Sequence, residues 1–521
     1  MKTVATSCLL FAIGVGVNLT FARRGFLPLD QSIVFDGGWR LVSGQVPFHD
    51  FVAPSGLVPS AIQAAFVSVL GLTWFAYCLH ASIVNGLFAV AVYALLRSCG
   101  ATRVEAGGAG ALSAFFFYPP AGTPFMDQHS FFFMTLMFLA VAWGTVAAGT
   151  TELIAWCAVP ILFVLGYLSG QIPMAFGAVA VAIWVAVQPQ RAPRWLAALA
   201  AGTAFAACCL IAVHAVWPLD WSSAWTYTVT LPLHVAGDRT ARPGAIGPLR
   251  MVLATLVRFP LWIKMWSLDV ALLAAIPLVF LRRSRPHWAL QVWLLVTCIV
   301  TTAAFLAFTR TLMPTGLALT MVIVGVAIVG SREALPGAVA APLIAFLGLA
   351  AVRDTVVFVA TVDVPRLEHV QFNAAEADRA EGHLPPGLEF MRWSRGPSGY
   401  DADELTALVR FLRESDGNFL LVGDSSILYG LTGKPSVSPV LWMDPRLSMP
   451  HPDAPEFAAF ERDLIERARR AGVRRIVLDR PQTWTHLTFD HFPQLEALTR
   501  SGGCGVRSFG GARVLEICPA S

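Results

Sequence analysis

The sequence predicts an all-α polytopic membrane protein followed by a small α/β domain outside the membrane. Three observations support this fold class. Hydrophobic residues occupy 56% of the 521 positions and charged residues only 13%, whereas globular proteins carry about 25% charged residues. The mean hydropathy of +0.63 indicates many spans in a bilayer. From Asp354 onward the composition changes to charged and polar, which predicts a domain boundary between 1–353 and 354–521.

Apolar segments that can cross a bilayer core of about 30 Å recur through the first domain. We expect about 11 crossings from a cytoplasmic N-terminus, and this odd number leaves the C-terminal domain outside. The spans are placed at about 3–22, 73–96, 106–118, 130–148, 152–168, 172–188, 195–217, 267–281, 288–308, 312–330 and 337–353. The outer loops are then expected at 23–72, 119–130 and 218–252.

The topology depends on how the segment from Gly56 to Gly71 is read. Its 16 residues cover about 24 Å at about 1.5 Å per residue, which is short for a crossing, so we expect an interfacial or re-entrant helix. Basic loops at Arg97 and Arg191 then fall on the cytoplasmic side, as the positive-inside rule requires. Arg23 and Arg24, which follow the first span, go against that rule. A cleaved signal peptide is the alternative reading of the first span.

The C-terminal domain alternates helical and strand patterns. Residues 401–415 and 455–472 have apolar residues at helical spacing, whereas 418–424, 474–479 and 513–518 are short β-type runs. This alternation predicts a small α/β domain of about 150 residues, enough for its own core. Cys504 and Cys518 flank a turn, where a three-residue loop centred on Gly511 would set them opposite each other. A disulfide and two free thiols are both compatible with this pattern.

The stretch from Pro28 to Pro54 is the strongest candidate for chemistry. It lies between apolar segments, yet it contains three aspartates, an arginine and a histidine. Ionisable groups so close to a membrane are costly unless they are solvated or functional. They are Asp30, Asp36, Arg40, His49 and Asp50.

This stretch resembles the first outer loop of the C-type (GT-C) membrane glycosyltransferases, the class of the protein O-mannosyltransferases and aminoarabinose transferases. In that class an acidic residue follows the first span, and a glycine, a Pro-aromatic-x-Asp-Phe turn and a Gly/Pro-rich interfacial helix come next. The matching positions here are Asp30, Gly44, Pro47 to Phe51 and Pro54 to Gly56. The second acidic loop of the class is similar to 124–129. The likeness covers residues 1–190 and continues beyond them only in hydropathy.

Two positions depart from the pattern of the class. Many relatives have Asp-Glu where this chain has Asp30 and Gln31, which leaves one carboxylate to act alone. The Lys-Gln pair often seen near the fifth span corresponds here to Gly170 and Gln171. Without the lysine, a contact to the donor phosphate at this place is in doubt.

The resemblance implies roles for the acidic residues. Asp30 suits the base that takes the acceptor's proton, since a partly dry cavity would raise its pKa. Asp127 would orient the acceptor or bind a divalent cation together with His129. The structural alternative makes Asp30 the N-cap of a helix over 31–43.

The remaining members of the stretch have weaker claims. Asp50 is expected either to contact substrate, with His49 beside it, or to brace its turn by accepting backbone N–H bonds. Asp36 is expected on a solvated face. Arg40, Arg239, Arg242 and Arg310 are candidates for gripping a phosphate with a bidentate fork. Arg310, between two spans, has simple snorkelling to the interface as its alternative.

The function implied is transfer of a sugar from a polyprenyl-phosphate donor to an extracytoplasmic acceptor at a bacterial-type inner membrane, by an inverting displacement. We expect the lipid-linked donor, membrane lipid and the acceptor as partners, and no nucleic acid. No nucleotide cofactor is expected, because the chain lacks a G-x-G-x-x-G or P-loop at a strand–helix junction. A divalent cation is left open. The alternatives are a transporter or glycan flippase, which would place ionisable residues inside the spans, and a glycan polymerase or ligase.

The C-terminal domain is expected to assist substrate binding. Gly423-Asp424-Ser425-Ser426 follows a predicted strand, but a lone Gly-Asp-Ser lacks the nucleophile-elbow pattern of a hydrolase, and a binding loop is preferred. Deletion of residues 360–521 is expected to weaken acceptor binding while slow hydrolysis or transfer of the donor sugar continues.

Overall fold

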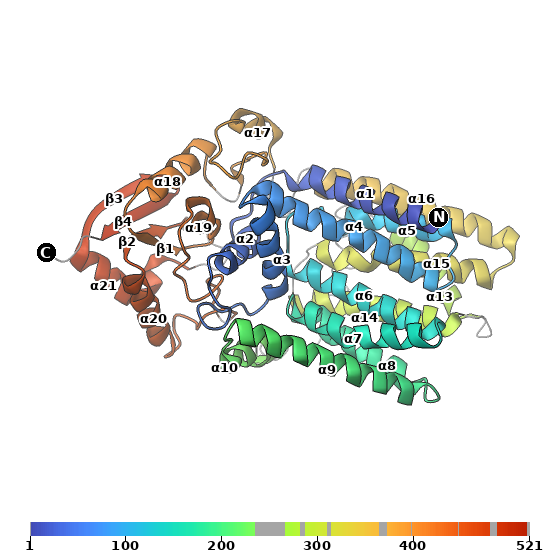
Figure 1. Ribbon diagram of the computed structural model, residues 1–521. Coiled ribbons are helices and arrows are strands. Elements are labelled where there is room, and N and C mark those ends of the chain that lie inside the picture. Colours follow the sequence, from blue (N-terminus) through green and yellow to red (C-terminus); the bar gives the residue numbers. More distant parts are fainter. Residues whose placement is uncertain are drawn as a thin grey trace. The chain divides into compact units, whose positions relative to one another are not determined.

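The computed structural model describes residues 2–234, 266–281, 287–309, 314–363, 372–396, 399–445, 447–479 and 487–517. The chain forms two compact units (Figure 1). Unit 1 comprises 1–22, 81–213 and 239–368, and unit 2 comprises 23–80, 214–238 and 369–521. This division differs from the boundary expected at residue 354. Residues 23–72, expected as an outer loop of the first domain, belong to the same compact unit as the C-terminal residues.

Most of the membrane helices belong to unit 1. Eight of the described helices are long and apolar enough to cross a bilayer. They are α1 (Lys2–Ala22), α4 (Trp74–Ser98), α6 (Met126–Val146), α7 (Thr150–Tyr167), α9 (Ala192–Val216), α14 (Trp288–Thr309), α15 (Thr320–Ala334) and α16 (Gly337–Phe358). Two shorter apolar helices of this unit are α8 (Gln171–Ala186) and α13 (Trp266–Val279). The chain is therefore a multi-pass membrane protein with the predicted fold class.

The expected number of crossings is not confirmed by these helices. The segment expected to cross at 106–118 is α5 (Arg103–Phe116), which has 14 residues and extends about 21 Å. α3 (Leu57–Leu70) also has 14 residues, in agreement with the short helix expected there. The 3₁₀-helix η2 (Pro314–Leu319) precedes α15, and the π-helix η3 (Val359–Asp363) extends α16 beyond the boundary expected at residue 354.

A buried asparagine ties three helices of unit 1 together. The Asn85 side-chain amide, on α4, donates to the carbonyls of Gly14 on α1 and Ala114 on α5, at 2.8 and 3.0 Å. Its Oδ1 atom accepts from the Tyr118 N–H at 3.3 Å. In a bilayer, helix contacts of this kind depend on close packing and polar side chains rather than on the hydrophobic effect. The close packing occurs where Gly14 of α1 faces Gly86 of α4, and an added Cβ on Gly14 would lie 2.6 Å from the Gly86 Cα.

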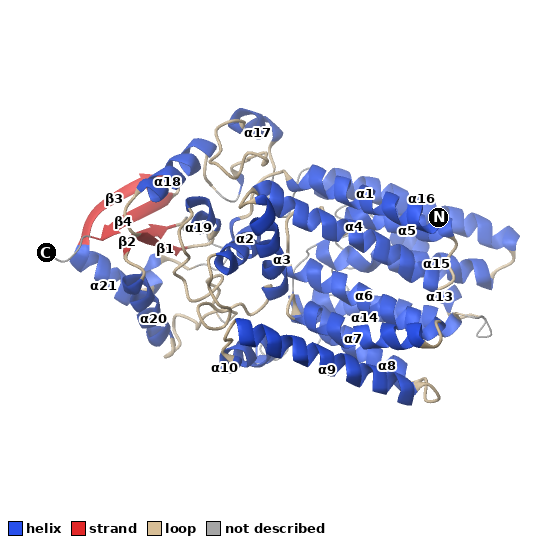
Figure 2. Ribbon diagram, viewed as in Figure 1, coloured by secondary structure: helices blue, strands red, loops and turns tan. Residues whose placement is uncertain are grey.

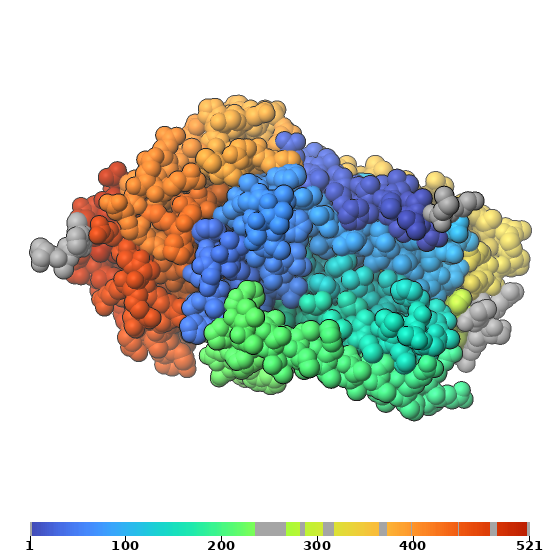
Figure 3. Space-filling view, in the orientation of Figure 1, coloured from blue at the N-terminus to red at the C-terminus, as the bar shows by residue number. Residues whose placement is uncertain are grey.

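The apolar core of unit 1 contrasts with its outer helices. Buried residues of α5, α13, α15 and α16 pack together around Phe116, Ala275, Met321 and Leu347. By contrast, most side chains of α9 are exposed, and they form part of the green surface in Figure 3. An exposed apolar helix of 25 residues is what a lipid-facing position requires.

Unit 2 contains the only described sheet of the chain (Figure 2). Its elements are α2 (Pro28–Val42), α3, α10 (Trp221–Trp225), η1 (Thr226–Thr230), α17 (Ala374–Ala380), α18 (Ala402–Glu414), β1 (Asn418–Val422), α19 (Ile427–Thr432), α20 (Phe457–Arg470), β2 (Val473–Leu478), η5 (Phe489–His491), α21 (Pro493–Gly502), β3 (Gly503–Phe509) and β4 (Ala512–Ile517). The predicted helices correspond to α18 and α20, and the predicted strands to β1, β2 and β4. β3 was expected only as the first arm of the cysteine hairpin, because Val506 is the only β-branched residue in its sequence.

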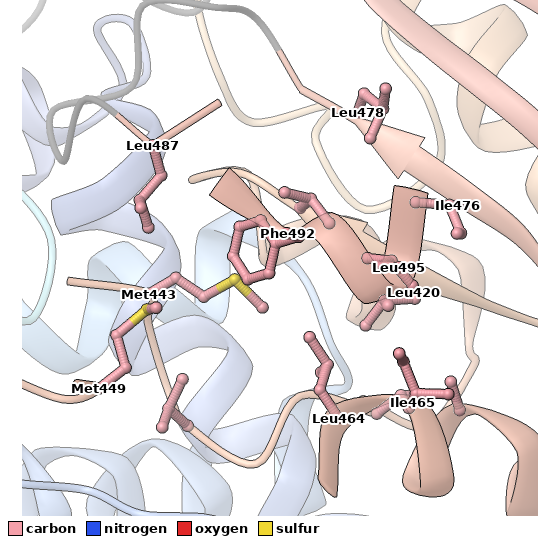
Figure 4. Packing of buried hydrophobic residues seen from close by; sticks show 14 of the residues in the cluster. Leu420, Met443, Met449, Leu464, Ile465, Ile476, Leu478, Leu487, Phe492 and Leu495 are labelled. Atoms are coloured by element: carbon pink, nitrogen blue, oxygen red, sulfur yellow. The ribbon is translucent and has the colours of Figure 1, made fainter. Parts of the chain in front are cut away.

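The sheet has the strand order β1-β2-β4-β3. β1 and β2 are parallel, and the other pairs are antiparallel. One face packs against α20 and α21, where Leu420, Ile476, Leu464 and Leu495 are buried together with Phe492 (Figure 4). This core gives the C-terminal part the α/β architecture predicted from its alternating pattern.

The cysteine hairpin has a different register from the one expected. β3 and β4 are joined at Phe509↔Ala512, so the turn contains two residues, Gly510 and Gly511, rather than three. A bulge between Gly503 and Gly505 then shifts the register by one residue. Cys504 is disulfide-bonded, whereas Cys518 lies outside the described residues.

Candidate functional site

Asp30 lies in the first turn of α2, in unit 2. The helix begins at Pro28, whose fixed φ favours a helix start. Leu27 is the N-cap residue, so the alternative that Asp30 caps the helix is wrong. The Asp30 side chain is partly buried, and burial raises its pKa from 3.8 to about 6 because a dry environment disfavours the charged form. None of the described residues forms a hydrogen bond or ion pair with this carboxyl group.

Gln31 performs the capping that was expected of Asp30. Its Oε1 atom accepts from the Leu27 backbone N–H at 2.8 Å, and the side chain is buried. The amide therefore satisfies a donor that the start of a helix leaves without a partner. This contact gives Gln31 a structural role at the start of α2.

Asp36 and Arg40 form a buried ion pair on α2, with Arg40 Nε 2.7 Å from Asp36 Oδ2. The prediction of a solvated Asp36 is wrong, since neither side chain is more than 1% exposed. All five N–H donors of a guanidinium are used here. Nη1 donates to Gln45 Oε1 and to the Ser438 carbonyl at 2.8 Å, and Nη2 to Ser436 Oγ and the Val440 carbonyl. This arrangement favours a structural role for Arg40 over the phosphate contact expected from the sequence.

His49 and Asp50 lie in the turn after α2. Asp50 Oδ2 accepts from the Val46 backbone N–H at 2.7 Å, and Oδ1 lies 2.9 Å from His49 Nδ1. The Asp50 carbonyl accepts from Arg467 Nη1 at 2.6 Å. Asp50 thus braces its turn, as the structural alternative predicted. His49 is 64% exposed, so its ring remains accessible to solvent.

Asp127 and His129 lie in unit 1, in the first turn of α6. His129 is buried, and its Nδ1 atom is 2.5 Å from the Tyr118 hydroxyl and 3.1 Å from the Phe125 carbonyl oxygen. Asp127 is partly buried near the helix N-terminus, where the macrodipole favours a carboxylate. Tyr118 was not singled out from the sequence, because a tyrosine at the end of an apolar run has no local signature of function.

The loop that lacks the lysine of the related class lies beside Asp127. Ser130 Oγ donates to the Gly170 carbonyl at 2.6 Å. A Cβ added to Gly170 would lie 3.4 Å from Asp127 Oδ1. The segment before α8 and the first turn of α6 are thus neighbours within unit 1.

The resemblance leaves a divalent cation open, with Asp127 and His129 as its candidate ligands. Within the described ranges, no group of three or more His, Cys, Asp or Glu side chains is arranged to hold a metal ion. Nδ1 of His129 is already bonded to Tyr118 and Phe125.

Other expected site residues fall in different places. Arg239, Arg242 and Arg310 lie outside the described residues. Unit 2 contains two pairs of these residues, Asp36 with Arg40 and His49 with Asp50. Unit 1 contains Asp127 and His129, both in the first turn of α6. Asp30 belongs to unit 2.

The Gly-Asp-Ser-Ser loop follows β1, as predicted. Ser425 Oγ is buried and, among the described residues, has no hydrogen-bond partner. Its backbone N–H donates to Asp479 Oδ2 at 2.9 Å, and the Tyr400 hydroxyl donates to Asp479 Oδ1 at 2.5 Å. A nucleophilic serine needs a base within hydrogen-bond reach, so this arrangement gives no support to a hydrolase.

A bundle of membrane helices with an α/β unit defines the fold class seen in GT-C membrane glycosyltransferases, as predicted. The structure of ArnT from Cupriavidus metallidurans bound to undecaprenyl phosphate is similar to this chain with a TM-score of 0.57 and 12% identity, and the match covers 98% of this chain and 97% of ArnT. The apo structure of the same protein gives 0.55 and 10%, covering 99% and 98%. No protein-family model and no curated protein matches the chain.

An oligosaccharyltransferase from Archaeoglobus fulgidus is also similar, with a TM-score of 0.44 and 12% identity over 90% of this chain and 68% of that protein. This similarity is too low to support an argument. At these identities the comparisons show the fold alone, and that fold is shared with ArnT from end to end.

Proposed function

We propose that this protein is a membrane glycosyltransferase that moves a sugar from a polyprenyl-phosphate donor to an acceptor outside the cytoplasm. The observation that carries the proposal is the fold shared with ArnT over 98% of the chain. The ArnT structure was solved with bound undecaprenyl phosphate, and a lipid-linked donor is consistent with the absence of a nucleotide-binding motif from this sequence.

Asp30 is proposed as the general base. Its carboxyl group has no described partner, and its pKa of about 6 leaves it ionised yet basic near neutral pH. In the proposed step the acceptor hydroxyl transfers its proton to Asp30 while its oxygen attacks the anomeric carbon. The bond from that carbon to the phosphate oxygen breaks, and polyprenyl phosphate leaves with the electron pair. Attack opposite the leaving group inverts the anomeric configuration.

Asp127 is proposed to orient the acceptor. Its position in the first turn of α6, beside the ordered contact of Tyr118 with His129, supports this role. Arg310 remains a proposed phosphate contact, and His49 a proposed substrate contact because its ring is exposed. Asp50 and Arg40 are not proposed for substrate contacts, since their side chains already form hydrogen bonds within unit 2.

The distribution of charge favours an enzyme over a transporter. α14 carries no charged side chain, and the charged side chains of the other seven candidate spans lie toward the helix ends. The acids that these helices carry include Asp127 and Glu152, both in the first turn of their helix. A transporter would need ionisable groups near the middle of several spans.

The proposal is tested with purified protein, an undecaprenyl-phosphate-linked sugar and a membrane extract as acceptor source. We expect sugar transfer that Asp30→Asn abolishes and that Asp453→Asn, which changes an acid 91% exposed to solvent, leaves unchanged. Mass spectrometry of the product separates transfer of one sugar from transfer of a preassembled glycan, which would indicate a polymerase or ligase. Full activity of Asp30→Asn would refute the assignment of the base.

A further inference from the structure

The helix that carries Asp30 is enclosed by protein. Of the 15 residues of α2, those that are buried lie on every side of the helix: Pro28, Gln31, Ser32, Ile33, Val34, Phe35, Asp36, Gly37, Gly38, Arg40 and Leu41. A surface helix would bury a single stripe. Part of this enclosure comes from α3, because an added Cβ on Gly38 would lie 2.7 Å from Gln63 Cγ.

The C-terminal residues of unit 2 hold the chain just before α2. The Gly25 N–H donates to the Arg392 carbonyl at 2.9 Å, and the Arg392 N–H to the Arg23 carbonyl at 2.6 Å. Arg23 Nε donates to the Phe390 carbonyl at 3.1 Å. Phe26 stacks on Trp393 with ring centroids 5.9 Å apart. These contacts also explain why two arginines can follow the first span, since Arg23 lies over the ring of Phe390 and Arg24 over that of Phe372.

A second contact holds the other end of α2, and its partner is Lys434–Leu441, which we call the clamp segment. Trp39 Nε1 donates to the Lys434 carbonyl at 2.9 Å, and Gln45 Nε2 to the Ser436 carbonyl at 2.7 Å. Arg40 donates to the Ser438 and Val440 carbonyls and to Ser436 Oγ.

The clamp segment needs these donors because it is buried without regular structure. Ser436 to Leu441 are all buried, and none belongs to a helix or strand. Buried carbonyls require partners. The Val52 N–H donates to the Pro439 carbonyl at 2.8 Å. Together with the bonds from Arg40 and Gln45, this contact gives four carbonyls of the clamp segment a donor from residues 40–52: those of Ser436, Ser438, Pro439 and Val440.

We propose that Arg40 is a positioning residue for the transfer reaction, which holds the C-terminal end of α2 on the clamp segment and thereby fixes Asp30. This inference rests on the proposed function, because the contact affects the reaction only through Asp30 as the general base. Asp30 lies ten residues before Arg40 on the same helix, about 15 Å along its axis. A helix transmits such a constraint as a rigid element, and a displacement of about 1 Å can lower a rate about 100-fold.

The test compares full-length variants that keep the fold but change this contact. Arg40→Lys retains a cation beside Asp36 but loses the planar fork to the clamp segment. Asp36→Leu with Arg40→Met replaces the buried ion pair by apolar side chains of similar volume, which is often neutral for stability. The matched control is Glu466→Leu with Arg470→Met, another i,i+4 pair in the same unit, whose side chains are more exposed.

Kinetics and hydrogen exchange are measured on each folded variant. We expect kcat about 10- to 100-fold lower with KM unchanged, and faster exchange of the α2 amides, for both Arg40 variants and not for the control. A purely structural Arg40 would lower the melting temperature and leave kcat per folded molecule and α2 exchange like the control, which would overturn the proposal.

Asp30→Asn is measured in parallel, so that two failures can be told apart. If that variant is fully active, the base assignment fails, and the exchange of α2 alone decides whether the clamp orders the helix. Unchanged exchange in both Arg40 variants refutes the clamp in either case.

Discussion

Asp30 and Asp50 carry the same carboxyl group in very different surroundings. Asp50 is held by the Val46 N–H and His49, whereas Asp30 is partly buried and has no partner among the described residues. Desolvation without a compensating donor raises the pKa of Asp30 to about 6. At the residue scale, this difference separates the carboxylate proposed as the base from one that braces a turn.

The raised pKa predicts how the rate depends on pH. A general base acts when ionised, so the rate should be constant above about pH 7 and fall tenfold per pH unit below about pH 6. The measurement is kcat/KM against pH, with donor in excess. An acid limb near pH 4 would mean that Asp30 titrates normally and is not the group described here.

The same shift predicts the effect of Asp30→Asn on stability. Because the folded pKa lies above the unfolded value of 3.8, stability is lost as pH rises between these values and the cost is fully present above pH 6. Asparagine removes that cost. The variant should therefore melt at pH 7.5 no lower than the wild type, measured in detergent, although it is inactive. A clearly lower melting temperature would mean that the carboxylate is stabilised by a contact.

The hydrogen bond between Tyr118 and His129 predicts a small loss of stability when it is removed. Tyr118→Phe removes the hydroxyl 2.5 Å from His129 Nδ1 and should cost about 1 kcal/mol of unfolding free energy. Tyr93→Phe is the control, since the Tyr93 hydroxyl is buried with no partner among the described residues. Equal effects in thermal melts of the two variants would contradict a role for this hydrogen bond.

At the scale of elements, α2 depends on Gly37 and Gly38 for its close packing against α3. An added Cβ on Gly37 would lie 2.2 Å from Ser60 Oγ on α3, which no real contact allows. We expect Gly37→Ala to cost about 1–3 kcal/mol by overpacking, and Ser60→Ala to recover part of that loss by removing the nearest atom. Gly107→Ala on α5, where nothing lies within 4 Å of the new Cβ, should be neutral or stabilising.

At the scale of the whole molecule, the composition of unit 2 changes what truncation should do. Because residues 23–80 contact 390–393 and the clamp segment, a chain ending at residue 368 would leave the buried ion pair of α2 without its partners. We expect limited proteolysis to cleave residues 23–80 of such a chain and sugar transfer to be lost. This prediction replaces the slow hydrolysis or transfer that was expected from the sequence. Protection of 23–80 in the truncated chain would contradict this prediction.

The membrane topology expected from the sequence can be tested by cysteine labelling. Single cysteines, introduced after replacement of the seven free cysteines of the described residues, should react with an impermeant reagent from outside near Asp50, Asp127 and His234. Those near Arg97 and Arg191 should react only after the cells are opened. Labelling of Asp127 from the inside would contradict the predicted topology and the proposed role of Asp127 toward an outer acceptor.

The sequence by itself determined the features that depend on local patterns. Apolar runs predicted the membrane helices, the change of composition near Asp354 predicted the α/β part, and period and residue type predicted β1, β2, β4, α18 and α20. The motif around Asp30 indicated the fold class that the comparison with ArnT confirms. These signals are readable because a bilayer and a sheet impose regular hydrophobic patterns on the chain.

Only the tertiary structure decided which polar groups meet. Asp36 reads as a surface residue and Arg40 as a free cation, yet both are buried because carbonyls 398 and 400 residues further along the chain accept from Arg40. An irregular buried segment such as Ser436–Leu441 has no period, and its partners are chosen by distance in space alone. For the same reason the sequence could name Asp30, but it could not show that the C-terminal residues hold its helix.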